Sequence, residues 1–211
     1  MEIVWLGHSC FRIRGKGATV VTDPFDKTLG YPVRKLNANI VTVSHDHPHH
    51  NFVEAVANSP KVISRPGEYE IANVFINGIP AFHDAEQGAL RGKNVVFFIE
   101  MEDLKICHLG DLGHLPTPEK LEQMSDADVL MVPVGGVMTL GATQAAEAIS
   151  LLSPRLVLPM HYKTDVVSIE LEPIERFLKE MGLKEVEPQP KLMVTKSTLP
   201  TETRVIVLDY R

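Results

Sequence analysis

Cysteine is scarce, positive charge is not in excess, and long hydrophobic runs are absent, and each of these features excludes a class of protein. The 211 residues include two cysteines, Cys10 and Cys107, which is too few for a disulfide-stabilised scaffold. Each lies inside an apolar, strand-like run, where a buried free thiol behaves as a small hydrophobic side chain. Acidic side chains outnumber basic ones by 27 to 21, and the formal charge of −6 argues against general binding to nucleic acids or other polyanions.

Membrane spans and export signals are also missing from the pattern. No apolar run approaches the ~20 residues that a transmembrane helix needs, which argues against a membrane partner. Residues 1–6 carry no basic leader followed by an apolar core and a small-residue cleavage site, so we expect no signal peptide and a cytoplasmic location. No change of composition marks a linker and no tandem repeat occurs, so we expect a single domain over residues 1–211.

Short β-type runs, separated by turn-forming residues, dominate the first half of the chain. The predicted strands there are residues 2–6, 10–13, 19–22, 39–43, 62–64, 74–79, 95–101 and 104–108. Tight turns at residues 14–17 and 101–104 are expected to join hairpins. In the second half, predicted helices beginning at Pro118, Thr143 and Pro173 alternate with strands at 128–132, 156–158 and 204–209. Helices that follow strands on the outside of β-layers indicate an α/β fold.

Histidine is abundant and unevenly distributed. Of nine histidines, four fall within residues 45–50, directly after the apolar, β-branched run 39–44. In an extended backbone, residues two apart point the same way, so we expect His45, His47 and His49 to converge while His50 approaches from another side. Imidazoles at this spacing suit zinc or a similar divalent ion. The alternative is a solvated polar loop, which fits less well because such a loop rarely follows a buried strand directly.

Three isolated residues have the same setting as the histidine cluster. His83, Asp111 and His161 each stand just after an apolar run that is predicted to be a strand. Singly, such a histidine is more often a hydrogen-bonded structural residue, and such an aspartate is more often a turn former. Because α/β folds gather functional groups at strand ends, ligands from four strand ends are expected to meet in one cleft. Together they offer enough nitrogen and carboxylate ligands for two metal ions.

The order of these motifs resembles the metallo-β-lactamase superfamily. The resemblance rests on Thr22-Asp23-Pro24, on His-x-His-x-x-His at 45–50, on His83, on His-Leu-Gly-Asp-Leu-Gly-His at 108–114 and on Met160-His161. Further stretches, at residues 7–11, 66–70, 133–136 and 159–162, resemble a small prokaryotic branch related to ascorbate-6-phosphate lactonase. Members of this branch are often named only as metal-dependent hydrolases.

The resemblance implies a four-layer αββα sandwich with a dinuclear metal site at one edge. Mapped onto this sequence, the first ion would be held by His45, His47 and His83, the second by His50 and His161, with Asp111 as the bridge. Asp23 resembles the family's carboxylate that orients a ligand imidazole, although Asp-Pro also starts turns. His8 matches a family position near the site, where it is a candidate to contact the substrate or a ligand.

One position departs from the family pattern. The superfamily has His-x-His-x-Asp-His, and this chain has His49 where the aspartate belongs. That aspartate usually ligates the second metal, so its loss leaves two dications balanced by little more than Asp111. Two interpretations stay open: His49 is itself a neutral ligand of a second ion, or the protein works with one ion. Asp46 could substitute only if the loop bends differently, because in an extended backbone it points away from its neighbours.

The predicted function is metal-assisted hydrolysis of a small molecule, with one or two divalent ions, zinc first and manganese or iron as alternatives. Substrates left open are lactones, other esters and phosphodiesters. His49 and His114 are the candidate catalytic residues for proton transfer to the leaving group. Lys163 and Arg91 are candidates to bind an anionic group, or are ordinary surface charges. The alternative function is a non-catalytic metal-binding protein; the oligomeric state is left undetermined.

Overall fold

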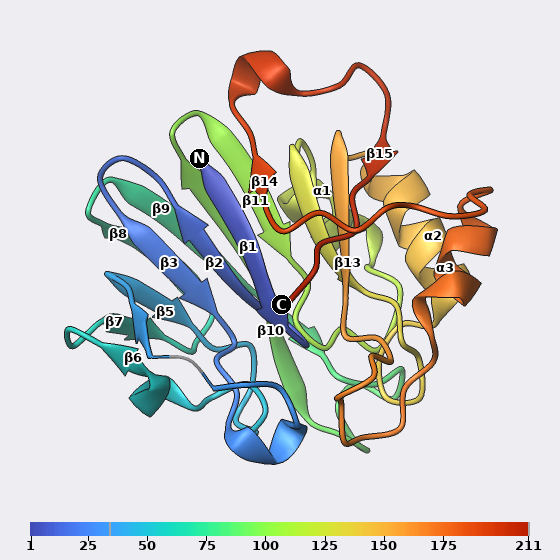
Figure 1. Ribbon diagram of the computed structural model, residues 1–211, viewed down its shortest axis with the longest axis horizontal. Coiled ribbons are helices and arrows are strands. Elements are labelled where there is room, and N and C mark those ends of the chain that lie inside the picture. Colours follow the sequence, from blue (N-terminus) through green and yellow to red (C-terminus); the bar gives the residue numbers. More distant parts are fainter. Residues whose placement is uncertain (34, 211) are drawn as a thin grey trace.

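Two β-sheets, built from strands that are distant in the sequence, form the framework of the molecule (Figure 1). The computed structural model describes residues 1–33 and 35–210. One sheet has the order β14 (Leu192–Met193), β1 (Glu2–Gly7), β2 (Cys10–Arg14), β3 (Thr19–Thr22), β5 (Ile40–Thr42) and β7 (Lys61–Ile63). The other has the order β15 (Arg204–Val205), β13 (Leu156–Met160), β12 (Val129–Pro133), β11 (Leu104–His108), β10 (Lys93–Met101), β9 (Val74–Phe82) and β8 (Gly67–Ile71).

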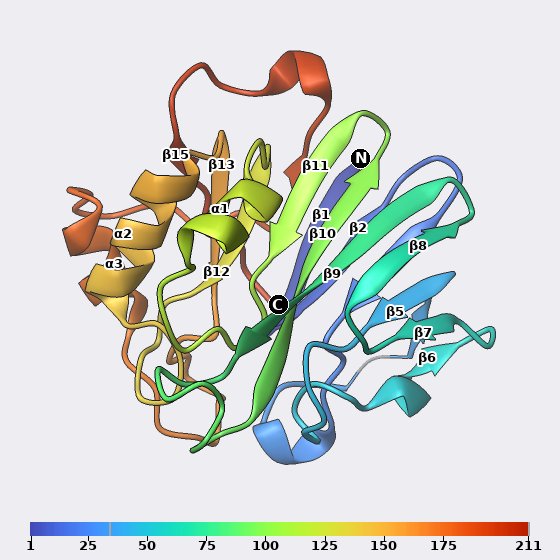
Figure 2. The same cartoon turned by 180° about the vertical axis from the view of Figure 1, so that it is seen from behind.

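Helices are few and short. The α-helices of the described residues are α1 (Pro118–Met124), α2 (Ala142–Leu152) and α3 (Ile174–Glu180), all in the second half of the chain. Helix α2 packs on β12, and α1 and α3 pack on α2 (Figure 2). Single 3-10 turns occur at η1 (Lys27–Leu29), η2 (Val53–Ala55) and η3 (Lys196–Thr198), and a two-stranded ladder joins β4 (Leu36–Asn37) to β6 (Val56–Ala57). The α/β class expected from the sequence is confirmed.

One contiguous hydrophobic core holds these layers together. Its largest fully buried side chains include Trp5, Phe11 and Phe97, which come from β1, β2 and β10. Burying a side chain of this size stabilises the fold by about 1.5–3 kcal/mol each. Both cysteines are free and buried in this core, as expected.

Local sequence signals explain several element boundaries. The β10–β11 hairpin turns at Glu102 and Asp103, whose φ angles of 51° and 63° are those of a tight two-residue hairpin turn, as predicted. Helix α1 begins after Thr117, whose side chain accepts a hydrogen bond from the backbone N–H of Lys120. Helix α3 is followed by Gly182 at φ 71°, the expected glycine stop.

Other boundaries differ from the expectations. The last strand was expected over residues 204–209, and β15 comprises only Arg204–Val205. Beyond the bond from the backbone N–H of Ile206 to the carbonyl of Val157, the chain leaves β13 and pairs with Gln189. The strands β4, β6, β8 and β14 were not predicted; three of them have only two residues. No helix among the described residues is long and apolar enough to cross a membrane.

Strand direction decides where functional side chains gather. Strands β11, β12 and β13 run parallel to one another, and so do β3 and β5 in the other sheet. Strand β9 lies antiparallel to β10, which lies antiparallel to β11, so β9 and β11 also end at the same edge. The carboxyl ends of these strands are therefore neighbours, and the residues that follow them share one end of the sandwich.

Candidate metal centre

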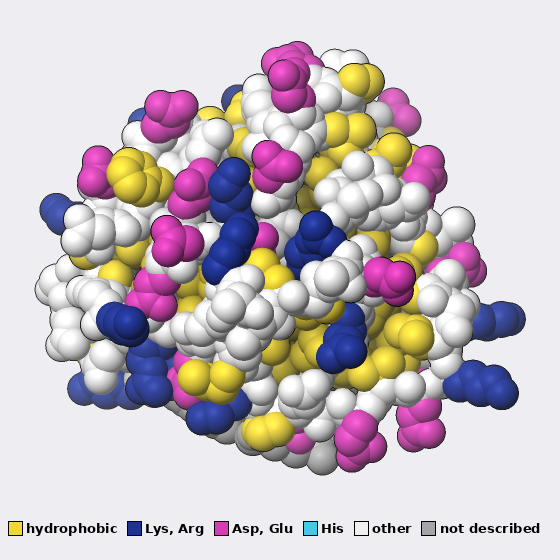
Figure 3. All heavy atoms as spheres, turned by 90° about the horizontal axis from the view of Figure 1, so that it is seen from above, with side chains coloured by type: hydrophobic (Ala, Val, Ile, Leu, Met, Phe, Trp, Pro, Cys, Tyr) yellow, Lys and Arg dark blue, Asp and Glu magenta, His cyan; other side chains and the backbone are white. Residues whose placement is uncertain are grey.

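Four imidazoles surround one carboxylate at that end. The Oδ2 atom of Asp111 lies 3.2 Å from Nε2 of His50, 3.3 Å from Nε2 of His83, 3.3 Å from Nε2 of His161 and 3.9 Å from Nε2 of His45. Asp111, His50, His83 and His161 are buried, and His45 is half-buried. The structure thus brings five predicted ligands together in one place. Figure 3 shows the end of the molecule away from this centre, where no histidine is visible among the described side chains.

The Asp111 carboxylate is placed by a glycine and an asparagine. Gly110 follows β11 with φ at 58°, and a Cβ there would lie 2.6 Å from Cβ of Ser44 and 2.5 Å from Oδ1 of Asn94. That same Asn94 oxygen accepts the backbone N–H of Asp111 at 3.0 Å. Only glycine lets the chain approach β10 this closely and turn Asp111 toward the histidines.

A buried aspartate orients two of the imidazoles. Asp23, which follows β3, has its Oδ2 atom 3.0 Å from Nδ1 of His50 and also accepts the Ser44 hydroxyl at 2.6 Å. Its Oδ1 atom accepts the backbone N–H of Ser44 at 2.8 Å. The Ser44 hydroxyl lies 3.0 Å from Nδ1 of His45. Asp23 therefore directs Nε2 of His50 toward Asp111 and, through Ser44, reaches the ring of His45.

The histidine cluster is turned, not extended, and the expectation of an extended backbone is wrong. Strand β5 ends at Thr42, and the N–H groups of His50 and Asn51 donate to the carbonyl of His47 at 2.8 and 2.9 Å. The amide of Val43 still pairs with β7, whereas those of His47, His50 and Asn51 pair within the turn. His45, His47 and His50 still converge, because the turn carries His50 back beneath the first two rings.

His49 and Asp46 lie beside this convergence. Nε2 of His49 lies 3.3 Å from Oγ1 of Thr28, and the His49 ring centroid is 4.7 Å from that of His47. His49 belongs to none of the ligand groups found among the described residues, so its role as a ligand remains a prediction. Asp46 is exposed and accepts a hydrogen bond from the side chain of Asn51. It belongs to none of the ligand groups found among the described residues, although the backbone here is turned and not extended.

Three groups of side chains have ligand atoms within 4.8 Å of one another: His45, His83 and Asp111; His45, His47 and His50; and His8, His50 and His161. Several of their nitrogens are buried without a hydrogen-bond partner among the described residues, namely the Nδ1 atoms of His8, His83 and His161. Burial lowers the pKa of His45 to about 3, so its imidazole is neutral, as a metal ligand must be. These residues fit a divalent metal ion of the kind that imidazole and carboxylate ligands bind.

Without a metal ion, the charges of the buried carboxylates Asp23 and Asp111 are balanced by the neighbouring histidines. Burial would lower the pKa of His50, but the carboxylates of Asp111 and Asp23 raise it to about 10. Burial likewise disfavours the charged form of Asp111, and His161 and His50 outweigh it and hold the pKa of that carboxyl well below its usual range. Asp111 is therefore an anion at neutral pH, able to bridge cations.

The remaining candidates occupy different positions. Nδ1 of His114 lies 2.8 Å from the carbonyl of Leu115, while its Nε2 is buried without a hydrogen-bond partner in the described chain, and its ring lies 6.0 Å from that of Phe82 at the end of β9. Both ring nitrogens of His108 are hydrogen-bonded to backbone groups, Nε2 to the carbonyl of Ser9 and Nδ1 to the N–H of Gly110, which suits a structural role. Lys163 donates to the carbonyl of Val167 at 3.0 Å and so is tied to its own loop.

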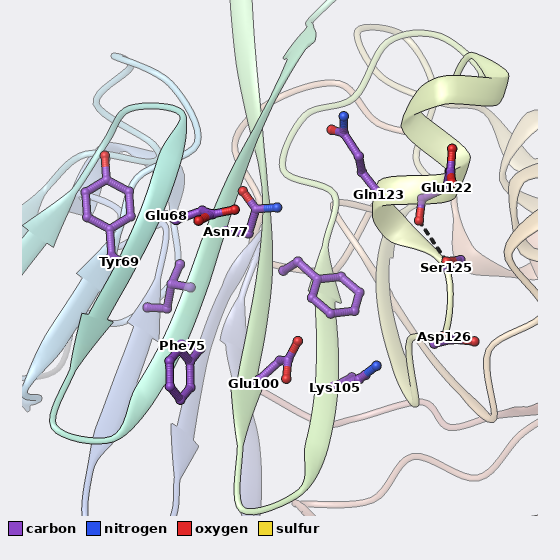
Figure 4. Close-up of a pocket in the computed structure, with 12 residues that line it drawn as sticks. Glu68, Tyr69, Phe75, Asn77, Glu100, Lys105, Glu122, Gln123, Ser125 and Asp126 are labelled. Atoms are coloured by element: carbon purple, nitrogen blue, oxygen red, sulfur yellow. Dashed lines mark hydrogen bonds between the residues drawn. The ribbon is translucent and has the colours of Figure 1, made fainter.

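A cavity of about 960 Å³ opens beside His45. Its basic lining residues are Arg65, Arg91, Lys93 and Lys120, none of which forms an ion pair within the part of the chain that the structure describes. A cavity of about 520 Å³ on the outer face of β8–β11 has the opposite character, because Glu68, Glu100 and Glu122 line it and no histidine does (Figure 4). Of these two cavities, the basic one adjoins the candidate metal centre, since His45 lines it.

Comparison with known proteins gives the family. The beta-lactamase superfamily domain matches residues 2–161. A metal-dependent hydrolase of Pyrobaculum neutrophilum is 30% identical over 195 residues, covering 78% of this chain and 85% of the relative. A crystal structure from Thermotoga maritima, described as a candidate zinc-dependent hydrolase of the metallo-β-lactamase superfamily, is 40% identical with a TM-score of 0.81, covering 98% of this chain and 97% of that one. A metallo hydrolase of Ignicoccus hospitalis shares the fold, with a TM-score of 0.68 at 19% identity and coverage of 92% and 99%.

These matches agree with the geometry. The matched residues 2–161 include every member of the three ligand groups, from His8 to His161. The arrangement of imidazoles around Asp111 is the feature that a hydrolase using a metal ion requires. The chain therefore belongs to the metallo-β-lactamase superfamily and is a metal-dependent hydrolase.

Proposed function

We propose that this protein hydrolyses a small lactone, ester or phosphodiester that carries an anionic group, at a centre of two divalent metal ions. The observation that carries the proposal is the convergence of four imidazole Nε2 atoms on Oδ2 of Asp111. In this assignment His45, His47 and His83 would hold the first ion, His50 and His161 would hold the second, and Asp111 would offer its carboxylate to both. Zinc is the preferred ion, with manganese or iron as alternatives.

The bound metal would supply a water molecule of lowered pKa and would polarise the carbonyl or phosphoryl oxygen of the substrate. Asp23 keeps the ligand rings in place through His50 and Ser44. The candidates for proton transfer to the leaving group are His114, whose Nε2 is unpartnered, and His49, which stands beside His47. We assign the transfer to one of these two residues.

The substrate class follows from charge and space. The basic cavity beside His45 is large enough for a small metabolite, and its cations Arg65, Arg91 and Lys93 suit a phosphate or carboxylate group. Two dications with one bridging carboxylate would leave the loaded centre positive, which also favours an anionic substrate. The relation to ascorbate-6-phosphate lactonase and the cytoplasmic location, both inferred from the sequence, are part of this proposal.

The test is turnover by protein of measured metal content. Chain loaded with zinc is assayed against a chromogenic phosphodiester, an aryl ester and a lactone, each with and without a distal phosphate or carboxylate. We expect hydrolysis that disappears in His161→Ala and persists in Glu147→Gln, an exposed change on α2. Equal rates in wild type and His161→Ala, or no turnover of any substrate by fully loaded protein, would contradict the proposal.

A further inference from the structure

One group of candidate ligands contains a histidine that the family's ligand pattern does not supply. His8, His50 and His161 have ligand atoms within 4.8 Å of one another, and all three side chains are buried. The ring centroid of His8 lies 4.1 Å from that of His161 and 4.9 Å from that of His50. His8 thus occupies the side of the centre on which the second ion of the proposed pair would lie.

The backbone holds His8 in this position. It follows β1 with φ at 52°, in the left-handed region, and its carbonyl accepts the indole N–H of Trp5 at 2.9 Å and the backbone N–H of His161 at 3.1 Å. The two chain segments that present His8 and His161 are therefore joined directly. A non-glycine residue held at positive φ is strained, and such strain clusters at functional sites.

The His8 ring packs against the rings of His50 and His161, but no hydrogen bond among the described residues reaches its Nδ1 atom. His8 is 1% exposed. Burying a polar nitrogen without a hydrogen bond destabilises the fold, so such an atom calls for a ligand.

His49, which replaces the family's aspartate, is placed less favourably. It is half-exposed, its Nε2 atom faces the hydroxyl of Thr28, and its ring centroid is 6.1 Å from that of His8. It joins no ligand group among the described residues. The side chain at position 49, where the family has the aspartate that ligates the second ion, therefore points toward Thr28 and away from the ligand groups.

We infer that His8 completes the second metal site together with His50 and His161, so that an imidazole from the end of β1 takes the place of the missing carboxylate. The inference rests on the proposed dinuclear centre and names a ligand that the family pattern lacks. The second site then has three neutral nitrogens, with Asp111 as its single anionic ligand. Such a site prefers ions that favour imidazole, such as zinc, over manganese or magnesium, which favour oxygen ligands.

The experiment measures metal stoichiometry and affinity, not activity. Wild type, His8→Asn and His49→Asn are stripped with a chelator and titrated with zinc at fixed pH, with metal analysis after dialysis. Asparagine is chosen because it tolerates positive φ. We expect two ions for wild type and for His49→Asn, and one ion, or a second ion bound at least ~10-fold more weakly, for His8→Asn. His8→Asp, which restores a carboxylate, should recover the second ion.

A second measurement does not depend on a variant folding. In wild type labelled with ¹⁵N at histidine, the second equivalent of zinc should shift a ring nitrogen of His8 and leave both nitrogens of His49 unchanged. Two ions bound by His8→Asn with wild-type affinity, a single ion in wild type, or loss of the second ion in His49→Asn would each overturn the inference. A chain that binds two ions through His8 but hydrolyses nothing would refute the proposed function and leave this assignment intact.

Discussion

Replacing Asp23 by asparagine should weaken metal binding without removing a single ligand. Asp23 is completely buried and accepts three hydrogen bonds, from the backbone N–H of Ser44, from its hydroxyl and from Nδ1 of His50. In Asp23→Asn the new NH2 group either faces the N–H of His50, donor against donor, or faces the backbone N–H of Ser44, whose hydrogen bond is then lost. The His50 ring is therefore held less firmly toward Asp111. Such changes behind a ligand lower metal affinity by about 10–100-fold, which is about 1.4–2.7 kcal/mol.

The control is Asp128→Asn. Asp128 is also buried and accepts hydrogen bonds from Lys105 and Lys196, but it precedes β12, at the opposite edge of the sheet from the histidines. Both variants should lose folding stability, and only Asp23→Asn should lose zinc affinity when the dissociation constant is measured by competition with a chromophoric chelator at pH 7. Equal zinc affinity in the two variants would show that Asp23 is merely a structural aspartate and would refute the reasoning.

Three further outcomes are expected. His161→Ala should remain folded by circular dichroism but lose at least ~10-fold in hydrolysis and in metal affinity, because a ligand and not a core side chain is removed; unchanged affinity would contradict its assignment. Burial raises the pKa of Cys107 to about 12 and that of Cys10 well above its usual value. A thiol reagent at pH 8 should therefore modify neither cysteine until denaturant is added, and rapid labelling of the native protein would contradict their burial. Gly110→Ala should lower the melting temperature, because the positive φ of this residue costs at least ~1 kcal/mol of folding free energy with alanine and the new Cβ clashes with Ser44. A melting temperature equal to that of wild type would show that the backbone relaxes freely at this position.

Much of the scaffold could be predicted because its signals are local. Strands β3 and β11 have the bounds expected from their apolar, β-branched runs, and the turn at residues 101–104 follows from its Glu-Asp pair between two such runs. Strand β14 could not be predicted in this way. It has two residues and forms only because β1 offers it an edge, and pairing between segments so far apart leaves no local pattern in the sequence.

The candidate site shows the same division. Clustering and strand ends were enough to select His45, His83 and Asp111, which the fold then gathers. The turn after Ser44 was not foreseen, because it depends on which amides remain without a strand partner. The position of His8 beside His161 depends on a hydrogen bond between two segments that are 153 residues apart (161 − 8). From the sequence, only the family resemblance placed His8 near the site. The contact between the His8 and His161 rings is visible only in the structure.

The centre uses two different means to fix its rings. His45 and His50 are oriented by side-chain hydrogen bonds that lead back to Asp23. Within residues 1–33 and 35–210, no such bond reaches the Nδ1 atoms of His8 and His161. Both residues have positive φ, 52° and 53°, where the backbone limits the directions open to the side chain. Because the two segments are tied by a backbone hydrogen bond and buried in the core, the fold can sustain the strain. A substitution at Asp23 should therefore change the orientation of the His45 and His50 rings. The His8 and His161 rings are oriented by the backbone at the ends of β1 and β13, so they should keep their geometry as long as the two sheets are folded.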